Sequence, residues 1–328
     1  MKHLFVAGMG LLAAACGASP GAERAATPGV ATSPGPAARP AATLLENYLR
    51  DAREAWKAKD TARLAALYTK DARSTEIGEE ERTLAEMLDD MADGPFEVTF
   101  SRGLLNGNDA VVEWVYGGPH PARARVAVRG ASLLSFSADG RVRRETRYLD
   151  TSTSNAQIGA GFRHCLPHRE AVPDPTAAPT LHVGSAQDSD APARAWLGSA
   201  ESSAKASPVI AVANMFLPAD GAGAGGMAAA LASAFKDVSA TVTRCVSSPD
   251  LVACEVERRG TFAAPLIGIK PTGRTGTTHW LEVVDLDAGN VAAVTAYGSG
   301  REFARAFVDL DPTGFLSPAQ VVDPAACE

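Results

Sequence analysis

The sequence predicts an α+β protein built from two similar domains in tandem. In each half of the chain, hydrophobic residues first recur at helical spacing and then change to the alternation of a β-strand. The strands follow one another through short turns, which favours an antiparallel sheet, because parallel neighbours need long crossover connections. With 328 residues, 46% of them hydrophobic, the chain is long enough for about two domains.

The N-terminus has the layout of an exported protein. Lys2 and His3 precede an uncharged stretch, residues 4–15, that is too short to span a bilayer. Residues 12–16, LAAAC, resemble a bacterial lipobox, in which the cysteine receives lipid. We therefore expect residues 1–16 to be a lipoprotein signal peptide and Cys16 to be the lipidation site. An ordinary cleaved signal peptide and a retained anchor are the alternatives.

Residues 17–41 consist almost wholly of Gly, Ala, Ser, Thr and Pro. This composition offers no side chains for a hydrophobic core, so we expect a disordered linker. Together with the lipid, the linker would tether an exported domain pair to the cell envelope, at the periplasmic face or the cell surface.

The first repeat, residues 44–160, is expected to open with three helices. Thr43 and Glu46 form a capping box, Asp60 begins a second short helix that carries Tyr68, and Thr83 and Glu86 cap a third. The period then becomes two, which predicts a meander of four strands. These strands are expected at residues 96–100, 111–116, 126–136 and 141–150, with turns at 106–109 and 139–140.

The second repeat, residues 191–309, follows a Pro-containing linker at 161–190 and repeats this order. Helices are expected at residues 193–206, 207–216 and 227–235, the middle one because Ser207-Pro208 is a favourable helix start. Strands are expected at 238–246, 251–259, 277–286 and 291–297, and residues 310–328 form a C-terminal tail.

Four cysteines remain beside Cys16, and an exported chain is free to form disulfides. Cys245 and Cys254 flank a turn between two strand-like runs, so we expect them to pair across a hairpin. Cys165 and Cys327 then pair by elimination. A catalytic thiol at Cys165, beside His164, is the alternative reading.

Short motifs in both repeats resemble the SnoaL-like polyketide cyclases of the nuclear transport factor 2-like superfamily. They lie at residues 260–262, 265–268 and 271–274 of the second repeat and at 128–130, 139–142 and 148–150 of the first. The resemblance implies that each domain is a cone, in which a curved sheet wraps its helices and leaves an apolar pocket at the open end. It places the segment 260–274, with Phe262 and Leu266, across the rim of the second pocket, either roofing a cavity or filling it.

The resemblance also suggests which residues carry chemistry. In cyclases of this family a late-strand Asp is the acid or base, and Asp150 is the nearest match in the first repeat. Glu145 is a second carboxylate on the same strand, whereas Arg147 stands where the family often has an acid. The corresponding residues of the second repeat are Ala296 and Ser299, so that copy looks catalytically empty.

Other side chains are weaker candidates. His120 on a loop and His279 on a strand are placed to reach the first and second pockets, although a structural or exposed role is the alternative for both. Trp114 and Trp280 fit the sheet core better than a ligand platform.

The remaining motifs predict no cofactor and no metal. The glycine-rich residues 221–226 lack the acidic partner and second βαβ unit of a dinucleotide site, and Pro167 disrupts the His164 and His168 pair. The net charge of −7, without a basic cluster, excludes a nucleic-acid-binding protein.

Three functions are compatible with this sequence. We expect an envelope lipoprotein that binds a small apolar ligand or a protein partner without catalysis. The alternatives are an acid-base cyclase or isomerase that uses Asp150, and a purely structural envelope protein. The membrane is contacted only through the N-terminal lipid, and the two domains are expected to pack sheet to sheet as an intramolecular pseudo-dimer, as family members commonly dimerise.

Overall fold

In the computed structural model, the described residues are 41–93, 97–120, 123–150, 174, 176–199, 209–212, 230–266 and 269–309. The expected signal peptide, residues 17–40 of the expected linker and the C-terminal tail lie outside them, whereas Ala41 already belongs to the first helix. Within these ranges, none of the helices is both long and apolar enough to cross a bilayer.

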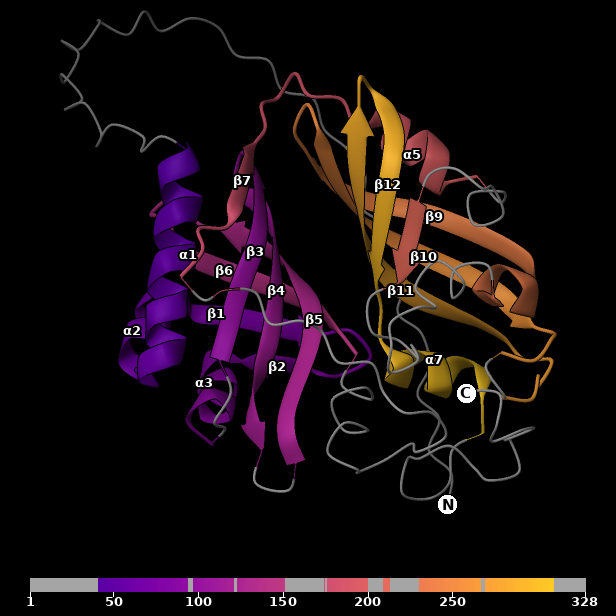
Figure 1. Cartoon of the computed structure of the whole chain (residues 1–328), viewed down its shortest axis with the longest axis horizontal. Helices are drawn as coiled ribbons and strands as arrows, with labels where there is room; N and C mark the ends of the chain where they lie inside the picture. Colours follow the sequence, from indigo (N-terminus) through magenta and orange to yellow (C-terminus); the bar gives the residue numbers. More distant parts are fainter. Residues whose placement is uncertain are drawn as a thin grey trace, which may run out of the picture. The chain divides into compact units, whose positions relative to one another are not determined.

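The first domain has the three expected helices, α1 (Ala41–Ala58), α2 (Thr61–Ala66) and α3 (Leu84–Asp93). They pack against a seven-stranded sheet in the order β2-β1-β6-β5-β4-β3-β7 (Figure 1). Its strands are β1 (Tyr68–Glu76), β2 (Glu81–Thr83), β3 (Glu97–Asn106), β4 (Asp109–His120), β5 (Arg123–Phe136), β6 (Val142–Leu149) and β7 (Thr180–Val183). The four expected strands are β3 to β6, which pair antiparallel in sequence order.

Two parallel strands of this sheet were not predicted. β1 pairs with β6, and β7, which lies in the expected linker, pairs with β3. The second helix was expected to carry Tyr68, but it ends at Ala66 and Tyr68 begins β1 instead. The register of β1 shifts between Tyr68 and Arg73, and this irregularity hides the period of two from a sequence reading.

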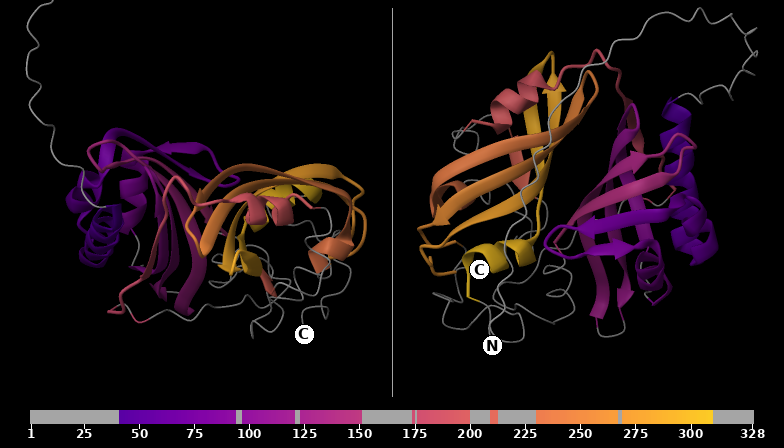
Figure 2. Two further views of the ribbon diagram at one scale, coloured as in Figure 1. Left: turned by 90° about the horizontal axis from the view of Figure 1, so that it is seen from above. Right: turned by 180° about the vertical axis from the view of Figure 1, so that it is seen from behind.

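The second domain has a strongly curved five-stranded sheet in the order β8-β12-β11-β10-β9 (Figure 2). The strands are β8 (Val209–Val212), β9 (Phe235–Ser247), β10 (Leu251–Phe262), β11 (Thr275–Asp287) and β12 (Asn290–Tyr297). The four strands from β9 to β12 are the expected antiparallel ones. The helices are α5 (Ala191–Leu197) and α7 (Gly300–Phe307), and residues 230–234 are also helical.

The second domain corrects two helix predictions. The expected helix at 207–216 is wrong at residues 209–212, where β8 runs parallel to β12. Three β-branched residues, Val209, Ile210 and Val212, favour a strand and outweigh the Ser-Pro helix start. The sequence analysis also missed α7, whose cap was visible as Ser299 and Glu302. The Ser299 side chain accepts a hydrogen bond from the Glu302 N–H.

Each sheet has an inner and an outer hydrophobic face. The inner face of the first sheet packs on α1, α2 and α3, and that of the second packs on α5 and α7. The outer faces contribute to one shared cluster, which includes Leu104 and Val111 from the first domain and Leu281 and Val283 from the second. The fold is therefore two α+β units whose outer sheet faces contact one another.

The predicted disulfide between Cys245 and Cys254 is confirmed. The two cysteines are direct partners on β9 and β10, with an S–S distance of 2.05 Å and Cα atoms 4.1 Å apart. Cys16, Cys165 and Cys327 lie outside the described residues, so the second pairing stays a prediction.

Candidate functional site

The first domain contains a cavity of about 220 Å³ between its helices and the inner face of its sheet. Most of the wall is apolar or aromatic, and includes Trp56 on α1, Met87 on α3, and Phe100 and Trp114 on the sheet. Polar side chains gather on the neighbouring strands β1, β5 and β6. They are Tyr68, Glu76, Ser132, Glu145 and Arg147. We call these five residues the polar pole of the cavity.

Strand alternation explains why β6 supplies several of these side chains. Glu145, Arg147 and Leu149 lie two residues apart and all line the cavity, whereas Tyr148 points to the opposite face, into the shared outer cluster. β1 brings Tyr68 and Glu76 to the same place through its parallel pairing with β6.

Glu145 is buried, with 6% of its surface exposed, and both of its carboxylate oxygens accept hydrogen bonds. Tyr68 Oη donates to Oε2 over 2.9 Å, and Ser132 Oγ donates to Oε1 over 2.7 Å. Ser132 in turn accepts from Trp114 Nε1 at 3.0 Å. These donors supply the hydrogen-bond partners that a buried carboxylate requires.

Two tyrosines stay protonated beside this carboxylate. Burial, reinforced by the negative charge of Glu145, raises the pKa of both Tyr48 and Tyr68 above the ordinary value. The hydroxyl oxygens of the two tyrosines are 3.4 Å apart. Because Tyr68 gives its proton to Glu145, Tyr48 is the donor in this longer contact.

Arg147 is the cation of the polar pole. Its Nη2 lies 3.4 Å from Glu76 Oε2, and the two side chains are only 18% and 11% exposed. Burial lowers the pKa of Arg147, but the carboxylates of Glu76 and Glu145 outweigh burial and hold that pKa above the ordinary value. The Nε atom of Arg147 is buried and has no hydrogen-bond partner.

Asp150 does not line this cavity. It is 1% exposed, and its Oδ1 accepts a hydrogen bond of 3.0 Å from the N–H of Gly300, the first residue of α7. Leu149 faces the cavity, so alternation directs its neighbour Asp150 away. The structure thus brings Glu145 to the cavity and places Asp150 at a helix N-terminus of the second domain, where a carboxylate is stabilising.

In the second domain, Phe262 and Leu266 are fully buried in the inner core. Phe262 stacks on Phe235 with ring centroids 5.4 Å apart, and Phe303 and Phe307 of α7 pack on the same ring of Phe235. The described part of the segment that interrupts the strands therefore packs into the inner core.

His279 was expected to point into the second cone, but it does not. Its ring is half exposed, with Nδ1 2.7 Å from Glu302 Oε1 and Nε2 3.8 Å from Glu257. It shares a sheet face with Leu281 and Val283, which belong to the outer cluster rather than the inner core. His120 ends β4, and its side chain lies outside the described part of the structure.

The second inner core still holds one charge pair that the sequence analysis missed. Glu282 is 2% exposed and accepts a 2.7 Å hydrogen bond from Arg258 Nε. Trp280 and Val284 of the same strand face belong to this core, as does Ala296. Ser299 caps α7. Ala296 and Ser299, the two residues at the positions of the family's acid, therefore both have structural roles.

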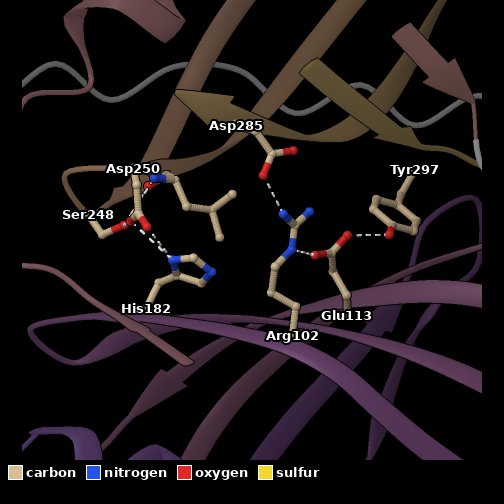
Figure 3. Close-up of polar contacts among 8 residues, drawn as sticks. Arg102, Glu113, His182, Ser248, Asp250, Asp285 and Tyr297 are labelled. Carbon is tan, nitrogen blue, oxygen red and sulfur yellow. Dashed lines mark hydrogen bonds and ion pairs between the residues drawn. The ribbon is translucent and has the colours of Figure 1, made fainter. Parts of the chain in front are cut away.

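Polar contacts between the outer sheet faces come in matched pairs. Tyr148 of β6 donates to Glu255 of β10 over 2.7 Å, and Tyr297 of β12 donates to Glu113 of β4. Figure 3 shows the second of these contacts, with Arg102 between Glu113 and Asp285.

The strand register shows that each contact has a counterpart in which the two domains exchange roles. Glu113 pairs with Arg102 and Glu255 pairs with Arg244. Arg102 donates to Asp285 over 2.5 Å, and Arg244 donates to Ser135, the position of β5 that corresponds to Asp285 on β11, over 2.9 Å.

Among the described residues, no group of three or more His, Cys, Asp or Glu side chains is placed to hold a metal ion. His164 and His168, and the glycine-rich residues 221–226, lie outside that part of the chain.

Two family models match the chain, one in each domain. A model described as a SnoaL-like domain matches residues 49–145, and one described as a SnoaL-like polyketide cyclase matches residues 219–298. No curated protein matches the sequence.

Similar solved structures match about a third of the chain. A hypothetical protein with a ketosteroid isomerase-like fold from Catenulispora acidiphila, in complex with trimethylamine, is 21% identical, covers 34% of this chain and 92% of its own, and has a TM-score of 0.32. A protein described as a SnoaL-like polyketide cyclase, from a Jannaschia species, is 17% identical, with 38% and 99% coverage and a TM-score of 0.32. Each of these chains is about the length of one domain.

Proposed function

Because the chain carries two SnoaL-like domains in tandem, we propose that the first domain binds a small, largely apolar molecule in its cavity and that the second domain has a supporting role. The cavity of about 220 Å³, with aromatic walls and one polar pole, is the observation that carries this proposal. In the second domain, Phe262 and Leu266 of the rim segment are buried in the inner core.

The volume fits a ligand of the size of a substituted single ring. An engineered apolar cavity of roughly 150 Å³ holds one benzene molecule, so a cavity somewhat larger accepts a ring with two or three further heavy atoms. Aromatic walls favour such a ligand through stacking and edge contacts.

The test is calorimetric titration of the full chain with ethylbenzene. We expect binding by the wild type and loss of binding in Ala52→Phe, because Ala52 lies on the cavity wall and is 1% exposed. Ala58→Phe, on the exposed side of the same helix, is the matched control and is expected to bind as the wild type does. Equal binding by all three proteins would count against the cavity as the site.

Acid-base catalysis is a second candidate function, supported by one observation. Glu145 is a buried carboxylate on an apolar cavity wall, which is the setting that enzymes use for a general base. A cyclase or isomerase would lose turnover in Glu145→Gln, whereas a binding protein would keep its affinity for ethylbenzene.

The two domains act as an intramolecular pseudo-dimer in this proposal. The register-matched contacts of Tyr148 with Glu255 and Tyr297 with Glu113 support it, because reciprocal contacts are the mark of a two-fold interface. The chain is then expected to be monomeric, since the outer sheet faces are already covered. Light scattering coupled to size-exclusion chromatography measures this directly, and a stable dimer would contradict it.

Envelope anchoring through Cys16 completes the proposal. The disulfide between Cys245 and Cys254 supports export, because disulfides persist in oxidising compartments. Labelling cells with a fatty-acid probe is expected to mark the wild type and not Cys16→Ser. Recovery of both proteins, unlabelled, in the soluble fraction would refute the lipid anchor.

A further inference from the structure

Helix α7 of the second domain presents two different faces. Phe303 and Phe307, four residues apart, are buried in the inner core of the second domain. Arg301 and Arg305 are also four residues apart, so they share another face of the same helix. Both arginines contact the first domain. Helix α7 therefore bridges the two domains.

The two arginines hold the turn between β1 and β2. Arg301 Nη1 lies 2.6 Å from Glu79 Oε1, and Arg305 Nη2 lies 3.8 Å from Glu79 Oε2. Arg305 also donates to the carbonyl oxygen of Gly78. Gly78 has a φ of +85°, and a Cβ on it would lie 3.0 Å from Glu302 Cβ. The turn thus packs directly on α7, and a glycine permits both the backbone conformation and the close approach.

Asp150 ties the first turn of α7 to the end of β6. Its buried carboxylate accepts a hydrogen bond from the N–H of Gly300, and it directly follows Leu149, which lines the cavity. Helix α7 therefore contacts the ends of both β1 and β6. These two strands supply four of the five residues of the polar pole.

The path from α7 to the cavity is short. Glu76 lines the cavity and stands two residues before Gly78. Glu76 and Arg147 are register partners on β1 and β6, and the N–H of Ile77 donates to the carbonyl oxygen of Arg147 over 3.0 Å. Movement of the turn away from α7 would therefore displace Glu76 and Arg147 from the cavity wall.

We propose that α7 positions the polar pole of the first domain, so that the affinity of the cavity for its ligand depends on the docked second domain. This inference rests on the proposed binding function and gives the second domain its role in it. Arg301 and Arg305 are positioning residues, since they touch the turn and not the cavity. Because coupling between two sites is reciprocal, a ligand in the cavity must also stabilise the docking of α7.

The test is calorimetric titration of the full chain with ethylbenzene. The wild type is compared with a double variant that carries Arg301→Met and Arg305→Met. The two side chains are 51% and 46% exposed, so these substitutions should leave the fold intact. The double variant is expected to bind about fivefold more weakly, at the lower end of coupling between sites, because partly exposed ion pairs are individually weak.

Arg194→Met is the matched control. On α5, Arg194 Nε lies 2.7 Å from Asp190, and Nη1 donates to the carbonyl oxygen of Val242 over 3.2 Å. Arg194 thus makes the same two kinds of contact as Arg305, but within the second domain. Its substitution is expected to leave the affinity at the wild-type value.

Glu79→Gln tests the same contact from the first domain. It removes the charge that both arginines share, so it is expected to weaken binding by the same factor of about five. Combined with Arg301→Met and Arg305→Met, it should cause no further loss, because the three side chains act through one contact.

Hydrogen exchange distinguishes positioning from general stabilisation. Ethylbenzene is expected to slow the exchange of the α7 amides in the wild type and not in the double variant. A purely structural role of the arginines would change this exchange by the same factor with and without ethylbenzene. If the double variant does not fold, the effect of ethylbenzene on α7 of the wild type still decides.

The outcomes separate this inference from the function on which it rests. Failure of the wild type to bind ethylbenzene would overturn the proposed function and this inference with it. Wild-type affinity in the double variant, or exchange of α7 that does not respond to ethylbenzene, would leave the cavity as a binding site and overturn positioning by α7. An equal loss of affinity in Arg194→Met would overturn it too, since the effect would then be a general one of the second domain.

Discussion

Tyr68→Phe is the substitution that best tests the polar pole, because it removes one hydroxyl and little volume. Glu145 then keeps only the hydrogen bond from Ser132 inside a buried site. Hydrogen bonds to charged groups contribute about 1.5–3 kcal/mol, so we expect the free energy of unfolding of the first domain to fall by about 2 kcal/mol. Urea denaturation, monitored by tryptophan fluorescence, measures this difference.

The control is Tyr48→Phe, which removes a hydroxyl from the same network at the longer distance of 3.4 Å and from a neutral partner. Its expected cost is below about 1 kcal/mol. In a Glu145→Gln background the cost of Tyr68→Phe should shrink to a similar value, because the acceptor is no longer charged. Two results would refute a hydrogen bond from Tyr68 to a charged Glu145. One is that Tyr68→Phe lowers the free energy of unfolding by less than about 0.5 kcal/mol in the wild type, and the other is that it lowers it equally in the wild type and in the Glu145→Gln variant.

Three further predictions follow from other parts of the structure. Cys254→Ala removes a disulfide that joins residues 9 apart, and the chain-entropy model gives a loss of about 2.7 kcal/mol in the free energy of unfolding of the second domain. Denaturation with and without reductant measures this loss. The reductant should destabilise the wild type and leave the variant unchanged. Gly130→Ala would place a Cβ 2.4 Å from the Trp114 ring, so we expect a loss of about 1–3 kcal/mol, and an unchanged denaturation midpoint would contradict this packing. Partial burial raises the pKa of Asp250, but hydrogen bonds from His182 and Ser248 outweigh it and hold the pKa below the ordinary value. This contact therefore stabilises the fold above the unfolded pKa of about 3.9 and is lost as the pH falls through the folded pKa, so the stability difference between wild type and Asp250→Asn should be present near pH 6 and close toward pH 3.

Local sequence signals accounted for the antiparallel strands and for the hairpin disulfide. Alternation and short turns are properties of neighbouring residues, and Cys245 and Cys254 are separated by only 9 positions. The parallel strands β1, β7 and β8 escaped prediction because each is fixed by a distant partner. Short segments of this kind carry too little pattern to be distinguished from a linker or a helix.

The candidate site was only partly visible for the same reason. Alternation along β6 places Glu145, Arg147 and Leu149 on one face, which a sequence reading can find. Tyr68 lies 77 residues before Glu145 and reaches it only through the β1–β6 pairing. The choice of Asp150 followed the family motif, and a shift of one residue along the strand directed it to α7 instead.

Whether the second cone is hollow could not be read from its rim segment. The apolar residues Phe262 and Leu266 indicate an apolar environment, and that environment is the same for a roof and for a plug. The side chains that pack on Phe262 come from Phe235 and from Phe303 of α7, which the rim segment itself does not reveal.

A crystal structure of the full chain soaked with ethylbenzene shows directly whether the cavity of the first domain is the binding site. We expect density for one ethylbenzene in this cavity, against the ring of Trp114. Density for the compound in another part of the chain, with none in this cavity at saturating ethylbenzene, would contradict the proposed binding function.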